Sequence, residues 1–190
     1  PLKKGRANAK TRGIVEMIQM RTVLADMVSA YTELKRAESV MDYGDLVAFA
    51  AQIAREIPEV GDVERQRYKV VLLDEFQDTS HAQMELFAGL FGASSGQGLG
   101  HPVTAVGDPN QSIYGFRGAS AGQLFSFPQR FQRIDHDGAP HPADTAQLTT
   151  AWRNAEHILD GANAIAAPLL GATTGPTQQI AGLKPRPGAP

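Results

Sequence analysis

The chain of 190 residues is long enough for one ordinary domain and part of a second. Its apolar fraction of 42% is typical of a globular protein, and the absence of cysteine excludes disulfides and thiolate metal sites and fits a cytoplasmic setting. No apolar run approaches the roughly 20 residues that span a bilayer, so we expect no membrane partner.

The net charge of −2 hides an uneven distribution along the chain. Up to Arg36 there are eight basic and three acidic residues, which gives +5, whereas residues 37–80 hold four basic and ten acidic residues, which gives −6. A basic leading segment is typical of contact with nucleic acid, but a solvated helix face explains it equally well.

Two amphipathic helices are predicted in the first third of the chain. The first has apolar residues at the i, i+3, i+4, i+7 spacing of one helix face. These residues are Met20, Val23, Leu24, Met27, Val28, Tyr31 and Leu34. The second helix follows the same spacing from Leu46 to Ile57, and we expect Pro58 to end it.

A short strand and a capped helix are predicted next. The segment Lys69–Leu73 has no polar residue after its first, which predicts a strand covered on both faces, as in a parallel sheet. Ser80 followed by Gln83 is a capping-box pattern, and it predicts a helix that Gly92 ends.

A second buried strand is predicted at Pro102–Val106, after a flexible connector over residues 93–101. Strand, helix and strand in this order predict a parallel pair joined by a right-handed crossover. Asp74 and Asp108, which follow the two strands, then lie at one carboxyl edge, where open α/β sheets bind their ligands.

The last third of the chain is predicted to begin with a linker at residues 138–144, which are rich in proline, glycine and aspartate. A strand at 147–150 and a helix at 154–166 follow. The final stretch KPRPGAP has little to bury, and we expect it to be disordered or a cut end.

Asp74 and Glu75 form a candidate magnesium–nucleotide site. The first carboxylate can bind Mg²⁺ through water, and the second can polarise the water that attacks a γ-phosphate. The same pair is also typical of a helix start stabilised by the helix dipole. A nuclease site with Asp74, Glu75 and Asp108 as metal ligands is a further alternative, whereas the five histidines fall in no metal-ligand spacing.

The stretch VGDPNQSIYGFRGAS follows the second strand and suits contact with unpaired nucleic acid. Gln111 can hydrogen-bond a γ-phosphate or its attacking water. Tyr114 and Phe116 are interleaved with Arg117. Aromatic side chains of such a surface stack on bases, which contributes roughly 1–3 kcal/mol per base, and arginine holds the nucleic-acid backbone. The alternative is that both aromatics are core residues, but two nearby glycines favour an irregular loop.

Two long stretches resemble signature motifs of the UvrD/PcrA/Rep/RecB-type superfamily 1A DNA helicases. VVLLDEFQDTS, which starts at Val70, resembles the second motif, and AVGDPNQSIYGFRGA, which starts at Ala105, resembles the third. MDYGDL at 41–46 resembles the segment before the Walker B strand, and LTTAWRN at 148–154 resembles the fourth motif. The resemblance therefore covers residues 41–167.

The resemblance implies an α/β fold. The chain would contain part of a RecA-like (P-loop NTPase) parallel sheet with flanking helices, plus a helical segment from an inserted subdomain. Residues 1–40 would be the helical end of the inserted 1B-like subdomain, and residues 41–137 the second half of motor domain 1A. Residues 138–190 would be a linker and the start of domain 2A.

The resemblance also implies a role for each site residue. Asp74 would hold Mg²⁺, Glu75 would activate the hydrolytic water of ATP, and Gln111 would couple the γ-phosphate to the DNA-contacting loop. Arg153 would reach the γ-phosphate as an arginine finger, and Asp78 would support the site. Three residues would lie along single-stranded DNA: Tyr114, Phe116 and Arg117.

Two departures from the family pattern concern Phe116 and Arg153. Phe116 stands where many members carry tryptophan. The fourth motif usually reads asparagine, tyrosine, arginine, serine, whereas Arg153 is flanked here by Trp152 and Asn154.

No Gly-Lys pair occurs in the chain, so the phosphate-binding Walker A loop is missing from it. We therefore expect an internal section of an ATP-dependent DNA helicase that acts in repair or recombination and is inactive alone. Its expected partners are single-stranded DNA, single/double-strand junctions, the rest of the parent helicase and a helicase–nuclease subunit. The alternative is a non-catalytic helicase-like module that binds DNA or a subunit.

Overall fold

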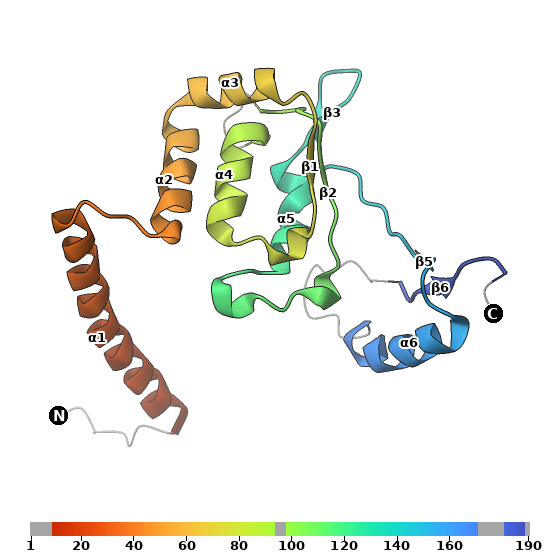
Figure 1. Cartoon of the computed structure of the whole chain (residues 1–190), viewed down its shortest axis with the longest axis horizontal. Helices are drawn as coiled ribbons and strands as arrows, with labels where there is room; N and C mark the ends of the chain where they lie inside the picture. Colours follow the sequence, from red (N-terminus) through yellow and green to blue (C-terminus); the bar gives the residue numbers. More distant parts are fainter. Residues whose placement is uncertain (1–8, 94–97, 171–180, 189–190) are drawn as a thin grey trace, which may run out of the picture. The chain divides into compact units, whose positions relative to one another are not determined.

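The computed structural model describes residues 9–93, 98–170 and 181–188, and the chain divides into two compact units. The first unit is Pro1–Leu46 and the second is Val47–Pro190 (Figure 1). Among the described residues, no helix combines the length and the apolar character that crossing a membrane requires.

The first unit consists mainly of α1 (Ala9–Ala37), a helix of 29 residues. This confirms the helix predicted from the apolar spacing around Met20 and extends it at both ends. The apolar stripe is nevertheless exposed, with 67% of Met20 and 64% of Met27 accessible to solvent. The periodicity thus identified the helix but not a partner for its apolar face.

The end of α1 and the start of α2 (Tyr43–Glu56) are joined by a charged cluster. Asp42 and Asp45 each accept a hydrogen bond from the other's backbone N–H, at 2.9 and 3.0 Å. Lys35 Nζ contacts Asp45 Oδ2 at 2.5 Å and Asp42 Oδ2 at 3.0 Å, and Tyr31 donates to Asp42 Oδ2 at 3.0 Å. The backbone N–H of Asp45 and then Lys35 and Tyr31 lower the pKa of Asp42 to about 2.

Pro58 ends α2 as predicted, but it also begins α3 (Pro58–Arg67), a helix that the sequence pattern did not predict. Proline suits the first helical position because its missing N–H would have no partner there. After the change of direction at Ile57, α3 packs beside α4 (His81–Phe91). The side chain of Arg65 donates to the carbonyl of Leu90, which joins the two helices.

The capping box predicted for α4 is present. Ser80 Oγ accepts from the backbone N–H of Gln83, and the Gln83 side chain accepts from the backbone N–H of Ser80. Gly92 ends the helix in an extended conformation. A Cβ there would lie 2.6 Å from the carbonyl oxygen of Arg130, so glycine is needed for a close approach and not for a positive φ.

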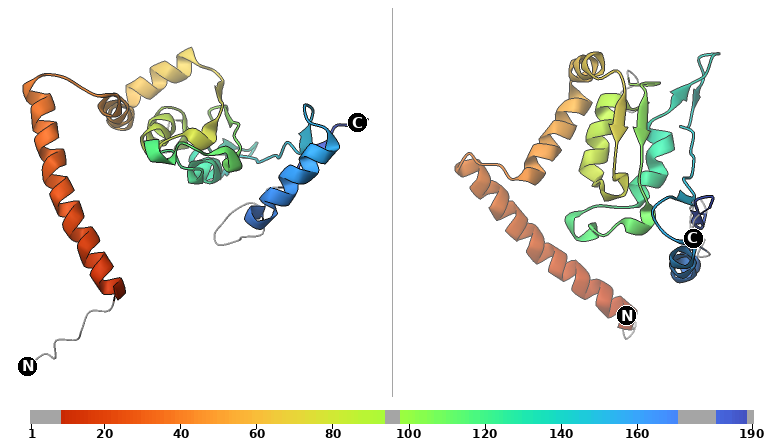
Figure 2. Two further views of the ribbon diagram at one scale, coloured as in Figure 1. Left: turned by 60° about the horizontal axis from the view of Figure 1, so that its bottom comes forward. Right: turned by 45° about the vertical axis from the view of Figure 1, so that its right-hand side comes forward.

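The core of the second unit is formed where a two-stranded parallel sheet packs against the helices α4 and α5 (Gly122–Arg130). Figure 2 shows these elements side by side. Its buried members are mostly aromatic: Phe76, Met84, Ala88, Phe91, Phe127 and Phe131. Phe76 packs edge-to-face on Phe127, with ring centroids 5.4 Å apart. Each buried phenylalanine contributes on the order of 1.5–3 kcal/mol.

The sheet pairs β1 (Val71–Leu73) with β2 (Val103–Ala105), and Val71 lies opposite Val103. The predicted parallel pairing is confirmed. The prediction that the strand is covered on both faces is wrong, because only Val71 and Leu73 pack on the core. Leu72, which points to the other face, is 76% exposed.

The last third of the chain contains more pairing than predicted. Residues 138–144 are not simply a linker, because β4 (Pro140–His141) forms an antiparallel pair with β3 (Arg133–Ile134). The strand expected at 147–150 is β5 (Thr150–Ala151), and the expected helix is α6 (Glu156–Leu170).

The expectation of disorder at the C-terminal end is wrong for the residues that the structure describes there. β6 (Lys184–Pro185) pairs in parallel with β5, and Lys184 lies opposite Thr150. Residues 189–190, together with 94–97 of the predicted flexible connector, lie outside the described residues.

Candidate functional site

Asp74 and Glu75 lie on a two-residue excursion at the carboxyl end of β1. Val106 donates to the carbonyl of Leu73 at 2.8 Å and accepts from the backbone N–H of Phe76 at 2.9 Å. The strand pairing thus resumes immediately beyond the two acidic residues. The backbone of Glu75 is in the left-handed region, at φ 50°. This conformation is uncommon for a non-glycine residue and is found preferentially at functional sites.

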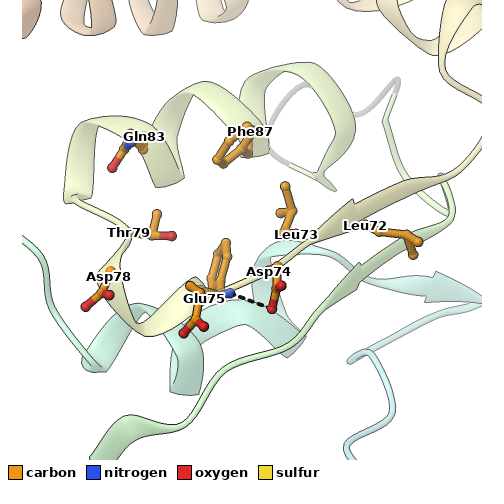
Figure 3. Close-up of a pocket in the computed structure, with 9 residues that line it drawn as sticks. Leu72, Leu73, Asp74, Glu75, Asp78, Thr79, Gln83 and Phe87 are labelled. Carbon is orange, nitrogen blue, oxygen red and sulfur yellow. Dashed lines mark hydrogen bonds between the residues drawn. The ribbon is translucent and has the colours of Figure 1, made fainter. Parts of the chain in front are cut away.

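Asp74 has one carboxylate oxygen occupied and one available. Its Oδ1 accepts from the backbone N–H of Glu75 at 2.9 Å (Figure 3), and none of the described residues donates to its Oδ2. Mg²⁺ needs few protein ligands, because it keeps several waters and binds phosphate oxygens. An exposed carboxylate with a free oxygen at the sheet edge therefore fits a magnesium–nucleotide complex.

No three acidic or histidine side chains of the described part of the chain come together in a group that could hold a metal ion. The Asp108 carboxylate is already used, because it accepts from the Asn110 backbone N–H and the Gln111 side chain. The nuclease alternative, which needs Asp108 as a third ligand, therefore receives no support.

A hollow of about 340 Å³ opens beside the two carboxylates. Figure 3 shows its lining, which comes from the end of β1, the turn after it and α4. The lining residues are Leu72, Leu73, Asp74, Glu75, Phe76, Asp78, Thr79, Gln83 and Phe87. Oδ1 of Asp78 is buried and has no hydrogen-bond partner among the described residues, so this lining includes an unsatisfied acceptor.

Gln77 was not singled out by sequence analysis, yet it lies at the centre of the site. It belongs to the short 3₁₀ helix η1 (Phe76–Asp78), is only 1% exposed, and bridges the two strand ends. Its Nε2 donates to Glu75 Oε2 at 2.6 Å, and its Oε1 accepts from the Asp108 backbone N–H at 3.0 Å. The signal available in the sequence was an uncharged glutamine between the acidic residues Glu75 and Asp78 of the motif.

Asp108 and Gln111 belong to the turn that follows β2. Asp108 caps the 3₁₀ helix η3 (Pro109–Gln111) by accepting from the Asn110 backbone N–H at 2.9 Å. Its other oxygen accepts from Gln111 Nε2 at 2.8 Å. Glu75, Gln77, Asp108 and Gln111 thus form one chain of hydrogen bonds, and the predicted meeting of both strand ends at one edge is confirmed.

The loop of residues 114–117, called here the aromatic loop, is exposed, which is what a stacking surface requires. Tyr114 precedes and Phe116 lies within the 3₁₀ helix η4 (Gly115–Arg117), and Phe116 is 80% exposed. The Arg117 guanidinium lies 5.4 Å from the Tyr114 ring centroid and 5.5 Å from that of Phe116. Gly118 closes the turn at φ 86°, which is why a glycine is needed there.

Arg153 is not joined to this network. It lies in the bend between β5 and α6, where it and Trp152 are exposed. Among the described residues, no hydrogen bond or ion pair links it to Asp74, Glu75 or Gln111.

The N-terminal domain pattern of UvrD/REP helicases matches residues 6–132 of the chain. The ATP-dependent DNA helicase UvrD1 of Mycobacterium tuberculosis is 31% identical over 145 residues, which cover 76% of this chain and 18% of that protein.

Two further relatives match to a similar extent. The exonuclease/helicase subunit RexA of Lactococcus lactis subsp. cremoris is 32% identical over 146 residues, 77% of this chain and 11% of that protein. The ATP-dependent DNA helicase PcrA of Leuconostoc citreum is 32% identical over 143 residues, 75% of this chain and 17% of that protein. The chain thus spans less than a fifth of the length of these curated relatives.

Proposed function

The chain belongs to the UvrD/REP helicase N-terminal domain family, and on that premise we propose that it is part of an ATP-dependent DNA helicase. The parent protein would couple ATP hydrolysis to movement along single-stranded DNA in the cytoplasm, in repair or recombination. The observation that best supports this function is the hydrogen-bond chain from Glu75 through Gln77 and Asp108 to Gln111, because it joins a carboxylate suited to nucleotide hydrolysis to the turn that leads into the aromatic loop.

In this proposal the acidic residues at the sheet edge serve the nucleotide. Asp74 holds Mg²⁺, which when bound neutralises charge on the phosphate oxygens. Glu75 polarises the attacking water, and Gln111 reports on the γ-phosphate to the loop that follows. Arg153 reaches the γ-phosphate from the second motor domain, and Asp78 supports the site.

The aromatic loop serves the DNA in this proposal. Tyr114 and Phe116 stack on unpaired bases, and Arg117 contacts their backbone. Phe116 supplies a smaller ring than tryptophan, so its stacking contributes at the lower end of about 1–3 kcal/mol per base.

The chain would contribute one section of the motor. The β1–β2 pair would belong to a larger RecA-like sheet of domain 1A, formed by residues 41–137. Residues 1–40 would come from the inserted 1B-like subdomain, and residues 138–190 would lead into domain 2A. Without a Gly-Lys phosphate loop, the 190-residue chain would neither hydrolyse ATP nor unwind DNA by itself.

A component of a helicase–nuclease complex is the second candidate for the parent protein. RexA, which is named as an exonuclease/helicase subunit, matches this chain as well as the UvrD1 and PcrA helicases do. In such a complex the section could bind DNA or a partner protein without catalysis. The intact pair Asp74–Glu75 favours an active motor, because a non-catalytic module has no need of it.

Substitution Glu75→Gln in the full-length parent tests the motor. It removes the charge that polarises the attacking water but keeps the shape of the side chain. We expect DNA-stimulated ATP turnover to fall by about 10²-fold or more, with nucleotide binding retained in a fluorescent-nucleotide titration.

The matched control is Glu59→Gln, which changes an exposed carboxylate in the first turn of α3 and should leave turnover unchanged. The purified 190-residue chain serves as a second control and should show no ATPase activity. Retained turnover in the Glu75→Gln parent would assign the hydrolytic role to another residue and disfavour the motor role proposed for this site.

A further inference from the structure

We propose that Gln77 is the positioning residue that transmits the state of the nucleotide site to the DNA-contacting loop. The inference rests on the proposed function, and it concerns a residue that neither the nucleotide chemistry nor DNA stacking uses directly. It starts from the buried carboxamide that joins Glu75 to Asp108.

The two partners of Gln77 require one donor and one acceptor. The Glu75 carboxylate can only accept, so the amide nitrogen faces it at 2.6 Å; the Asp108 backbone N–H can only donate, so the amide oxygen faces it at 3.0 Å. A carboxamide of this length satisfies both at once. An aliphatic side chain satisfies neither, and a carboxylate would place a second negative charge beside Glu75.

Gln77 is held firmly at its own end of the bridge. Its side chain is 1% exposed, and the preceding Phe76 is buried against Phe127 in the aromatic core. A buried amide cannot replace a lost partner with water. When one hydrogen-bond partner moves, the amide must therefore move with it or lose that hydrogen bond. A displacement of the Glu75 carboxylate is therefore transmitted to the Asp108 amide.

The turn after β1 and the loop after β2 are also fastened at further points. Ser112 Oγ donates to the Gln77 carbonyl at 3.2 Å, and the Ser120 N–H donates to the Thr79 carbonyl at 3.3 Å. Ser80 and Ala119 form an isolated antiparallel β-bridge. Residues 114–117, which include Tyr114 and Phe116, lie between these attachments, so both ends of their loop are fixed to the segment that carries Glu75.

Gly107 makes this close approach possible. A Cβ at this position would lie 2.6 Å from Gln77 Oε1, 3.1 Å from Gln77 N and 3.2 Å from Phe76 N. Two of these neighbours are backbone atoms that cannot rotate away. The absence of a side chain at Gly107 thus allows the bridge to form at the end of β2.

The arrangement predicts reciprocal coupling. DNA bound to the aromatic loop that favours the present position of Asp108 also favours the present position of the Glu75 carboxylate, because the Gln77 amide holds both. By linkage, a nucleotide that engages Glu75 changes the affinity for DNA by the same factor as DNA changes the affinity for the nucleotide. Gln111 adds to the path, because Asp108 holds its side chain.

The test compares Gln77→Met with wild type in the full-length parent protein. Methionine keeps the length of the side chain but can make neither bond. We expect nucleotide affinity to stay within about twofold of wild type, while DNA stimulation of kcat falls about tenfold. We also expect the affinity for a single-stranded oligonucleotide, measured by anisotropy, to become the same with and without a non-hydrolysable ATP analogue.

Gln129→Met is the matched control, because Gln129 is exposed on α5, and it should behave like wild type. Ser112→Ala is a second, milder variant that removes one attachment and leaves the buried amide in place. It should lower DNA stimulation in the same direction, so the inference stays testable if Gln77→Met does not fold.

The outcomes separate this inference from the proposed function. If wild type shows no DNA-stimulated turnover, the proposed function is wrong; if Glu75→Gln retains it, the proposed role of this site is wrong. In either case the inference fails with it. If both behave as expected but the Gln77 and Ser112 variants keep full stimulation and a nucleotide-dependent DNA affinity, only the inference is wrong. Loss of coupling with nucleotide binding intact supports it.

Discussion

At the scale of the residue, the backbone of Glu75 has an uncommon conformation at the proposed nucleotide site. It is left-handed, which costs on the order of 1–3 kcal/mol for a non-glycine residue. Two features compensate locally, since its N–H bonds to the Asp74 carboxylate and its own carboxylate bonds to Gln77. The conformation is therefore maintained by its neighbours, which suits the catalytic role proposed for this carboxylate.

Asp42 provides a pH prediction at the same scale. Its pKa is lowered to about 2, first by the Asp45 backbone N–H and then by Lys35 and Tyr31. Because the folded pKa lies below the ordinary value, its stabilising effect is complete above about pH 4. It is lost as the pH falls toward 2.

A carboxylate ¹³C NMR titration of Asp42 in the 190-residue chain should therefore give a midpoint at a pH of about 2. In a Lys35→Met variant, which removes one of the three stabilising partners, the midpoint should move upward. A midpoint near the ordinary value of about 3.9 in wild type would show that the cluster does not form.

At the scale of single elements, the start of α4 is specified by two side chains in the local sequence. Ser80→Ala removes the acceptor for the Gln83 backbone N–H and should lower the free energy of unfolding by about 1 kcal/mol. Urea unfolding followed by circular dichroism measures this loss. Ser80→Asp keeps an acceptor and should stay close to wild type, whereas equal losses in both variants would contradict a capping role.

Other elements depend on neighbours that a local pattern does not identify. α3 was missed because Pro58 both ends one helix and begins the next, and its short sequence carries a weak apolar pattern. The strands β4 and β6 have two residues each and contain proline, so only their partners β3 and β5 define them. Such pairings arise from contacts across the chain.

For the whole molecule, the sheet of the second unit has one face covered by the core, while none of the described residues buries Leu72 on the other face. Leu73→Thr should lower the free energy of unfolding by about 2 kcal/mol, because Leu73 packs on the aromatic core. Leu72→Thr, one residue earlier, should change it by less than about 0.5 kcal/mol, because Leu72 is 76% exposed. Urea unfolding of the 190-residue chain compares the two, and equal losses would mean that both faces are buried.

The same contrast explains why the prediction of a strand covered on both faces was wrong. Val70 and Val106, like Leu72, are apolar but more than half exposed. An apolar run indicates surface that is suited to burial, and it does not reveal whether a covering element is present in the chain. The stripe of α1 around Met20 shows the same effect.

The amino-acid sequence by itself determined the helicase family, which the match over residues 6–132 confirms, together with the parallel strand pair, the capping box and the acidic strand ends at one edge. These follow from short-range patterns, because spacing and residue type act within a few residues of each other. Only the tertiary structure revealed the Gln77 bridge, the space left by Gly107 and the exposure of Leu72 on one face of the sheet. Each of these depends on atoms about 30 residues apart in the chain, or on whether another element covers a surface, and such relations arise only when the whole unit packs.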